Sequence, residues 1–146
     1  RLDQQATRDA LTSFQEFLDL HPDNERVPEV NKLMEELTDK LAYKELLNAR
    51  LYYNLGNYLG NNYLSAVVTA QNALKEFPTN KYRDELLFIV LQSKYEQAVQ
   101  SVQDKRMERF RDTVDEYYNY INDHPEGKFR KQADKIFADS QKVVKE

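Results

Sequence analysis

The stretch ALTSFQEFLDLHP at residues 10–22 decides the fold, because similar phrases return as AVVTAQNALKEFP at 66–78 and TVDEYYNYINDHP at 113–125. In each phrase, apolar or small residues stand four, eight and eleven positions before the proline, which is the spacing of one helix face. A second stripe follows eight and eleven positions after each proline. Proline ends a helix because it lacks an amide hydrogen and fixes its own φ angle. The chain therefore predicts three helix–Pro turn–helix units.

Three copies of one helical hairpin are typical of an α-solenoid, in which each hairpin buries its apolar face against its neighbours. We expect an all-α single domain over residues 1–146, with about six to seven helices. Proteins of this kind usually act as docking surfaces. Because a helical pattern is already running close to Arg1, we also expect a fragment that lacks an N-terminal anchor and the earliest repeats.

The breaks in apolar periodicity divide the chain into helices and turns. Helices are expected at about 3–20, 30–55, 63–77, 81–102, 105–122 and 128–144. The second could be one long helix or two, with a kink expected between Thr38 and Tyr43 because about 30 residues exceeds the usual helix length. The first helix is expected to bury Ala6, Ala10, Leu11, Phe14, Phe17 and Leu18. The long helix is expected to bury Val30, Leu33, Met34, Leu37, Leu41, Leu46, Ala49, Tyr53 and Leu55.

Composition excludes several function classes. The chain has no cysteine, so a disulfide or a thiolate metal site is impossible, and no cofactor site is predicted. A net charge of −4 disfavours general nucleic-acid binding, which needs a clustered basic surface. No segment approaches eighteen consecutive apolar residues, the length of a membrane-spanning helix.

Catalytic residues are not predicted. The only histidines, His21 and His124, each precede a repeat proline and are interpreted as turn residues. Two pairs of acidic residues stand at helical spacing, Glu35 with Asp39 and Asp112 with Glu116. We expect these carboxylates to stand in water, where nothing raises the pKa of one to make an acid/base pair.

Two features point to a binding surface. Lys105, Arg106, Arg109 and Arg111 form the strongest basic cluster, which is interpreted first as a solvated helix start and second as a site for an anionic partner. Ten tyrosines are also present, and tyrosine is enriched at interfaces. Tyr53, Tyr63, Tyr82 and Tyr117 are expected in the core, and Tyr52, Tyr58, Tyr95 and Tyr118 at a partner surface.

Parts of the chain resemble known families. The set Leu55, Gly56, Tyr63, Ala66, Ala70, Ala73 and Pro78 is similar to a tetratricopeptide repeat, although Gly56 and Ala66 stand two residues closer than in the consensus. The order ALTSFQEFLDLHP, NARLYY, the alanine-bearing helix ending KEFP, ELL and SKY resembles BamD, the outer-membrane assembly lipoproteins also described as competence or DNA-uptake lipoproteins. The wording GNNYLSAV is similar to Bacteroidetes-type members, and the likeness spans about residues 3–136.

The BamD resemblance implies a non-catalytic scaffold on the periplasmic side of the outer membrane, held by an N-terminal lipid anchor that this chain lacks. It implies three partners: a BamA-like barrel protein, other assembly lipoproteins and unfolded outer-membrane proteins. It implies membrane contact only through the anchor. The family's docking surface falls near LQSKYEQA, so we expect partner contacts at Lys94, Tyr95, Arg106 and Arg109, with Tyr52 and Tyr58 as further candidates.

Two other functions stay open. The chain could be a general tetratricopeptide adaptor that binds a short peptide in its concave groove. It could also be a hydrolase with an unrecognised site, which would need a closed pocket lined by converging carboxylates and a histidine.

Overall fold

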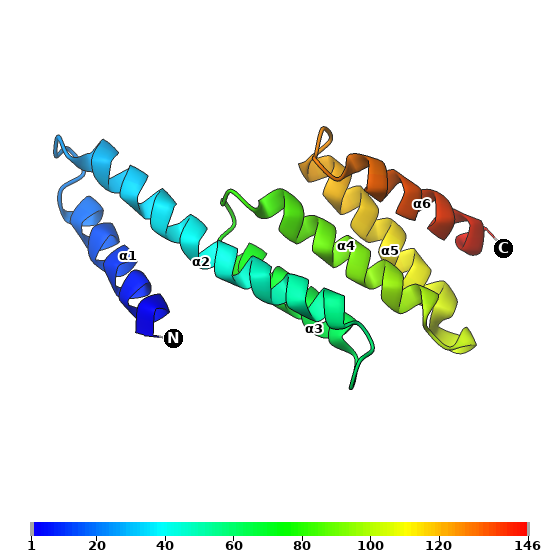
Figure 1. The fold of residues 1–146 in the computed structure, drawn as a ribbon. Helices are drawn as coiled ribbons and strands as arrows, with labels where there is room; N and C mark the ends of the chain where they lie inside the picture. Colours follow the sequence, from blue (N-terminus) through cyan, green and yellow to red (C-terminus); the bar gives the residue numbers. More distant parts are fainter. Residues whose placement is uncertain (1, 146) are drawn as a thin grey trace.

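The computed structural model describes residues 2–145 and is entirely helical apart from turns over that range (Figure 1). Its helices are α1 Leu2–Leu20, α2 Val27–Leu55, α3 Asn62–Glu76, α4 Arg83–Val99, α5 Gln103–Asp123 and α6 Arg130–Val144. Among these described residues, no helix is both long and apolar enough to span a bilayer. The predicted all-α fold is confirmed, with six helices.

The helices form a tetratricopeptide-like α-solenoid of three antiparallel hairpins, α1–α2, α3–α4 and α5–α6 (Figure 1). Each helix packs against the next, and α4 also contacts both α2 and α6. Over the described residues, α1, α3 and α5 make no such backbone approach to one another. Because α4 approaches both α2 and α6, these three helices form the inner layer of the array.

Helix α4 is the centre of the core. All residues from 86 to 91 are buried, because α2, α3, α5 and α6 surround this helix. One apolar cluster joins α2, α3 and α4 around Leu46 and Ala70, and a second joins α4, α5 and α6 around Leu91 and Tyr120. In the first cluster the small side chains of Ala66, Ala70 and Ala73 on α3 allow close helix approach.

The three proline turns share their hydrogen bonds. His21, Phe77 and His124 each donate their amide to the carbonyl four residues earlier, at 2.8–2.9 Å, and the proline follows directly. The interpretation of both histidines as turn residues is confirmed. In the second and third turns an arginine five positions after the proline, Arg83 or Arg130, donates Nη1 to the proline carbonyl at 2.8 Å.

Carboxylates tie successive turns to the preceding hairpin. Asp39 on α2 accepts the Lys81 amide at 2.9 Å, and Asp84 on α4 accepts the Lys128 amide at the same distance. Both amides lie three positions after a repeat proline. Each hairpin therefore holds the turn of the next one, which stacks the units in a fixed register.

Helix α2 is continuous through residues 38–43, so the expected kink is not a break in the helix. Leu41 and Ala42 are buried there against Phe77, and the segment contains no glycine or proline to interrupt it. The first half of α2 packs against α1, and the second half packs against α3 and α4. One long helix, rather than two, thus joins two hairpins.

Some helix boundaries differ from those expected. Helix α4 begins at Arg83 rather than Lys81, because the Asn80 side chain accepts from the Tyr82 amide and donates to the Phe77 carbonyl, which keeps these residues in a turn. It ends at Val99 rather than Val102. Helix α2 begins before Pro28, since proline is tolerated in the first helical turn.

The outer edge of the predicted core is wrong at three positions. Ala6 is exposed, and Leu33 and Leu55 are each 39% exposed. Helix α1 packs along α2 and meets the end of α3 through the Arg8–Glu76 ion pair and through the packing of Leu11 on the cluster that contains Phe77. Among the described helices, no further hairpin covers Ala6 or Leu33, and Leu55 is the last residue of α2, next to the exposed α2–α3 loop. Within α1, among the described side chains of residues 4–20, only Thr7 is buried.

The tyrosines divide differently from the prediction. Tyr117 is buried as expected, whereas Tyr53, Tyr63 and Tyr82 are half-buried. The most buried tyrosine is Tyr120, which the spacing analysis did not single out and which has no exposed surface.

Candidate docking site

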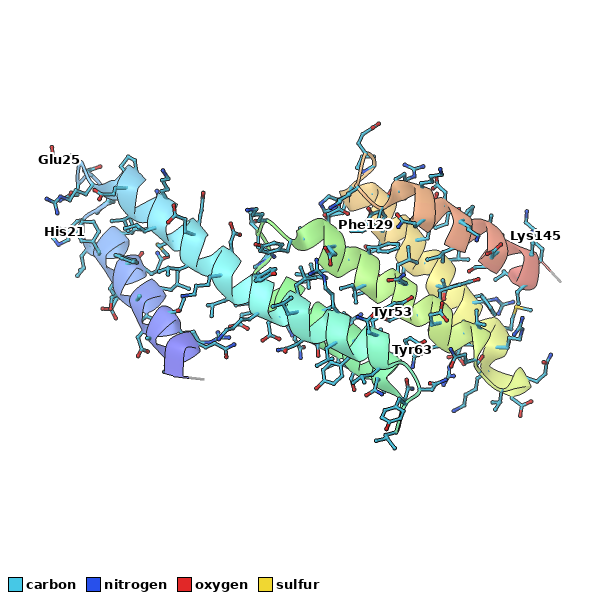
Figure 2. All side chains as sticks on the ribbon, viewed as in Figure 1. His21, Glu25, Tyr53, Tyr63, Phe129 and Lys145 are labelled. Atoms are coloured by element: carbon cyan, nitrogen blue, oxygen red, sulfur yellow. The ribbon has the colours of Figure 1, made fainter. Side chains whose placement is uncertain are left out.

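A groove runs along the inner layer, between α4 and its neighbours α2 and α6. Two adjoining hollows of about 290 and 200 Å³ form it, and they share Phe88, Gln92 and Gln132. Tyr53 from α2 and Phe129 just before α6 line the larger hollow (Figure 2). Tyr95 and Asp139 line the smaller one. The groove is therefore built from helices that are far apart in sequence.

The floor of the groove is aromatic and rigid. The ring of Phe88 stacks on Phe129 at 4.6 Å with an interplanar angle of 4°, and it meets Tyr120 edge-on at 6.1 Å. Phe88 is 4% exposed, so it shapes the groove without offering much surface. Contacts with a ligand would fall on the half-buried side chains around it.

The walls of the groove carry neutral polar side chains together with five charged ones, Arg50, Glu85, Glu96, Lys135 and Asp139. Arg50 binds Glu85 through two hydrogen bonds, with Nη2 2.6 Å from Oε1, and this carboxylate raises the pKa of Arg50. Burial, reinforced by the charge of Glu96, raises the pKa of Tyr53 to about 12. Burial also raises the pKa of Tyr95, whose hydroxyl lies 3.3 Å from Asp139 Oδ2. Both phenols are therefore neutral at physiological pH and can donate hydrogen bonds.

The expected contact residues Lys94, Tyr95 and Arg106 lie at the boundary of α4 and α5. The Lys94 ammonium is 2.9 Å from Glu116 Oε1, so its charge is already paired inside the chain. The Tyr95 ring meets the Phe110 ring edge-on at 6.2 Å. The Arg106 guanidinium lies over the same Phe110 ring, 5.0 Å from its centroid. These side chains form a ladder from α4 to α5.

The remaining candidates lie elsewhere. Arg109 lines a hollow of about 310 Å³ with the α2–α3 loop, beside the loop that carries Tyr58. Tyr58 is 68% exposed, whereas Tyr52 is half-buried against the α2–α3–α4 cluster. Tyr118, also expected at a surface, is 45% exposed. The six candidate residues thus do not form one continuous site.

The acidic pairs differ from the expectation of solvated carboxylates. Glu35 and Asp112 are exposed, but Glu116 is only 9% exposed and accepts from Lys94 and Asn119. Asp39 is half-buried because it accepts the Lys81 amide. Both carboxylates have structural roles that helical spacing could not show, since their partners are on other elements.

Neither histidine lines any of the hollows described above. His21 is exposed and lies 5.3 Å from the Phe17 ring, while His124 Nδ1 is 3.0 Å from Asp123 Oδ2. Within the described residues, no group of three or more histidine, aspartate or glutamate side chains is arranged to hold a metal ion.

The groove residues Phe88, Gln92 and Gln132 were missed by sequence reasoning. The spacing of Phe88, Gln92 and Glu96 does place them on one face of a helix. That signal cannot show which face meets α6.

No protein-family model matches the chain, and no curated protein matches it either.

Proposed function

We propose that this chain is a non-catalytic scaffold that binds an extended segment of a partner protein in the groove of α2, α4 and α6. The observation that carries this proposal is the groove between α2, α4 and α6, with its aromatic floor and with Gln92 and Gln132 facing each other across both hollows. A rigid groove lowers the entropic cost of binding, because its side chains are ordered before the partner arrives.

The carboxamides in the groove suit a peptide backbone. Gln92 and Gln132 stand on facing helices α4 and α6 and line both hollows. A carboxamide both donates and accepts, so it can pair with the N–H and C=O groups of an extended chain whatever its side chains. The groove would thus accept varied segments, with Tyr53 and Tyr95 supplying apolar contact.

We further propose that the partners belong to the outer-membrane β-barrel assembly machinery, with the chain on the periplasmic side of the outer membrane. The support is the order of BamD-like phrases from ALTSFQEFLDLHP to SKY. In this proposal unfolded outer-membrane proteins occupy the groove. A BamA-like protein then contacts the α4–α5 ladder at Arg106, outside the groove that Tyr95 lines.

Site-specific crosslinking tests the groove. A photoreactive phenylalanine at Gln132 should crosslink to peptides from unfolded outer-membrane proteins, whereas the same group at Gln71, an exposed glutamine of α3, should not. Equal crosslinking at both positions would refute specific binding in the groove. Crosslinking of arbitrary soluble peptides with equal efficiency would instead favour a general tetratricopeptide adaptor.

Recovery of a BamA-like protein tests the finer proposal. The lipoprotein that carries this domain should recover the BamA-like protein from outer-membrane extracts, and Arg106→Glu should lower the recovery roughly tenfold, since charge reversal at an interface costs more than 1 kcal/mol. Arg111→Glu is the matched control, because Arg111 is exposed on the same helix and is not part of the ladder. Absence of any BamA-like protein with the unmodified lipoprotein would contradict the assignment.

A further inference from the structure

The α2–α3 loop, residues 56–61, projects apolar side chains into solvent. Leu59 is 90% exposed, the highest value for a large apolar side chain among the described residues, and its neighbour Tyr58 is 68% exposed. Leu59 also has a left-handed backbone, with φ of 57°, which disfavours any residue with a β-carbon. A leucine at this position stabilises neither the core nor the loop, so its side chain is available for an external contact.

The loop is held in place by hydrogen bonds at its base. The Asn62 amide donates to the Gly56 carbonyl at 2.9 Å, and Asn62 Nδ2 donates to the Tyr58 carbonyl at 2.7 Å. Gly56 packs against the Tyr63 ring, where a β-carbon would be only 2.8 Å from the hydroxyl. Tyr58 and Leu59 are therefore held on an ordered loop, the knob (residues 56–61), rather than on a random coil.

The segment around the knob, from the end of α2 through most of α3, carries no charged side chain. No Asp, Glu, Lys or Arg occurs between Arg50 and Lys75, in a chain in which 32% of residues are charged. The surface of this segment exposes further apolar residues: Leu51, Leu55, Leu64 and Val68. A partner that covers the knob therefore meets no ionic group on this segment.

Basic residues flank the knob. The hollow beside the loop is lined by Asn57, Gly60 and Asn61 and by Arg109 of α5, so the start of α5 lies next to the knob. Figure 1 shows the α2–α3 loop and the α4–α5 turn at the same end of the molecule. Four basic residues at 105–111 stand against three acidic ones, Asp104, Glu108 and Asp112, and Val102 in the turn is 66% exposed.

The α1–α2 turn, at the opposite end of α2, has the reverse charge. Leu20, exposed at the end of α1, stands beside Asp19, Asp23 and Glu25, which outnumber Arg26. An anionic surface would therefore attract the α2–α3 end and repel the α1–α2 turn, which would orient the long axis of α2.

We propose that the knob end docks on an anionic lipid surface, with Tyr58 and Leu59 in the boundary between headgroups and acyl chains and with Lys105 and Arg109 against the lipid phosphates. Exposed aromatic and aliphatic side chains beside basic ones are what such a surface binds. A projecting knob buries its apolar area most readily in a deformable medium. A second copy of the chain fits less well, because joining two such ends would bring like charges together. This contact is separate from the proposed groove and from the implied lipid anchor.

Tryptophan fluorescence tests the proposal, because the chain contains no tryptophan. Leu59→Trp should show a blue-shifted emission with vesicles of phosphatidylcholine and phosphatidylglycerol, and the shift should shrink with added salt. Leu20→Trp is the control, because Leu20 is a 75% exposed leucine at the end of α1 beside an acidic turn, and it should show no shift. Helical circular dichroism unchanged from the parent chain confirms that both variants fold.

Vesicle flotation of the otherwise unmodified chain provides the second measurement. Leu59→Asp and the double variant Lys105→Gln/Arg109→Gln should each lower vesicle-bound protein roughly tenfold, since each removes an apolar or electrostatic contribution above 1 kcal/mol. The proposal is overturned if Leu59→Trp does not shift, or if neutral vesicles shift it equally. It is also overturned if the emission shifts without vesicles as protein concentration rises, which would assign the knob to a second copy.

Discussion

Replacement of Tyr120 by phenylalanine should be the most damaging removal of a single atom from this fold. The Tyr120 hydroxyl donates to Asp84 Oδ1 at 2.6 Å and accepts the Phe129 amide at 3.0 Å. It thereby joins α4, α5 and the start of α6 at one point. Tyr120 has no exposed surface, so water cannot replace the lost oxygen.

The magnitude follows from the two bonds. A hydrogen bond to a charged group contributes about 1.5–3 kcal/mol, and a buried amide left without a partner costs about 1–3 kcal/mol. Asp84 still accepts the Lys128 amide, which offsets part of the loss. We therefore expect Tyr120→Phe to lower the free energy of unfolding by about 3 kcal/mol, against a total of roughly 5–15 kcal/mol for a domain.

Tyr117→Phe is the matched control, three residues away on the same helix. Its hydroxyl donates to Asp134 Oδ1 at 2.7 Å, but that carboxylate is 49% exposed and is also held by Arg130. Water can take over there, so we expect a loss of only about 0.5 kcal/mol. Urea unfolding followed by circular dichroism at unchanged m-value measures both free energies. Equal losses for the two variants would refute the reasoning.

The hydrogen bond between Tyr120 and Asp84 also predicts a loss of stability at alkaline pH. Burial, followed by the hydrogen bond to Asp84, raises the pKa of Tyr120 above its ordinary value. A raised folded-state pKa contributes stability that is complete below the unfolded pKa of about 10 and is lost as the pH rises toward the folded value. The difference between the parent chain and Tyr120→Phe should therefore narrow above pH ~10. A difference that stays constant from neutral pH to pH ~11 would contradict this origin.

Four further predictions concern stability. Leu59→Asn should raise the free energy of unfolding by about 1 kcal/mol, because asparagine tolerates a left-handed backbone, while Leu64→Asn inside α3 should not stabilise. Ala70→Leu should cost about 1–3 kcal/mol by overpacking the alanine face of α3, whereas Val68→Leu on the exposed face should be near neutral. Gly127→Ala would push a β-carbon into the Tyr120 hydroxyl, so its cost in urea unfolding should shrink in a Tyr120→Phe background, and an unchanged cost would count against that contact. Arg83 lowers the pKa of Asp123, so the ion pair contributes stability above the ordinary carboxyl pKa, and this stability is lost as the pH falls through the lowered pKa. Arg83→Gln should therefore move acid unfolding to higher pH. At pH 7 it should cost less than about 1 kcal/mol, because both side chains are one-third exposed.

Burial at single positions shows where sequence reasoning stopped. Tyr117, Tyr118 and Tyr120 lie on one aromatic-rich helix, and residue spacing predicted the burial of Tyr117 and the exposure of Tyr118 but did not identify Tyr120 as a core residue. Tyr120 is completely buried because α4 supplies Asp84 and the next turn supplies the Phe129 amide. Leu33 follows the repeat spacing as well as Val30 does, yet it is exposed because no further hairpin packs on that side.

The candidate site shows the same division. Tyr58, Arg106 and Arg109 were identified from residue type, and the structure places Tyr58 on an exposed loop with Arg109 beside it. The pairing of Lys94 with Glu116 could not be foreseen, since the two residues lie on different helices. The groove joins α2, α4 and α6, so none of its hollows is a property of one segment.

The sequence by itself determined the helices, the three proline turns and the solenoid class, because amide hydrogen bonding, proline geometry and apolar periodicity act within a few residues of the chain. Only the tertiary structure decided which faces are closed, which charges are paired, and that a basic helix start lies beside an uncharged knob. These outcomes depend on contacts between residues far apart in the chain, where burial and solvation, rather than local backbone preference, determine the free energy.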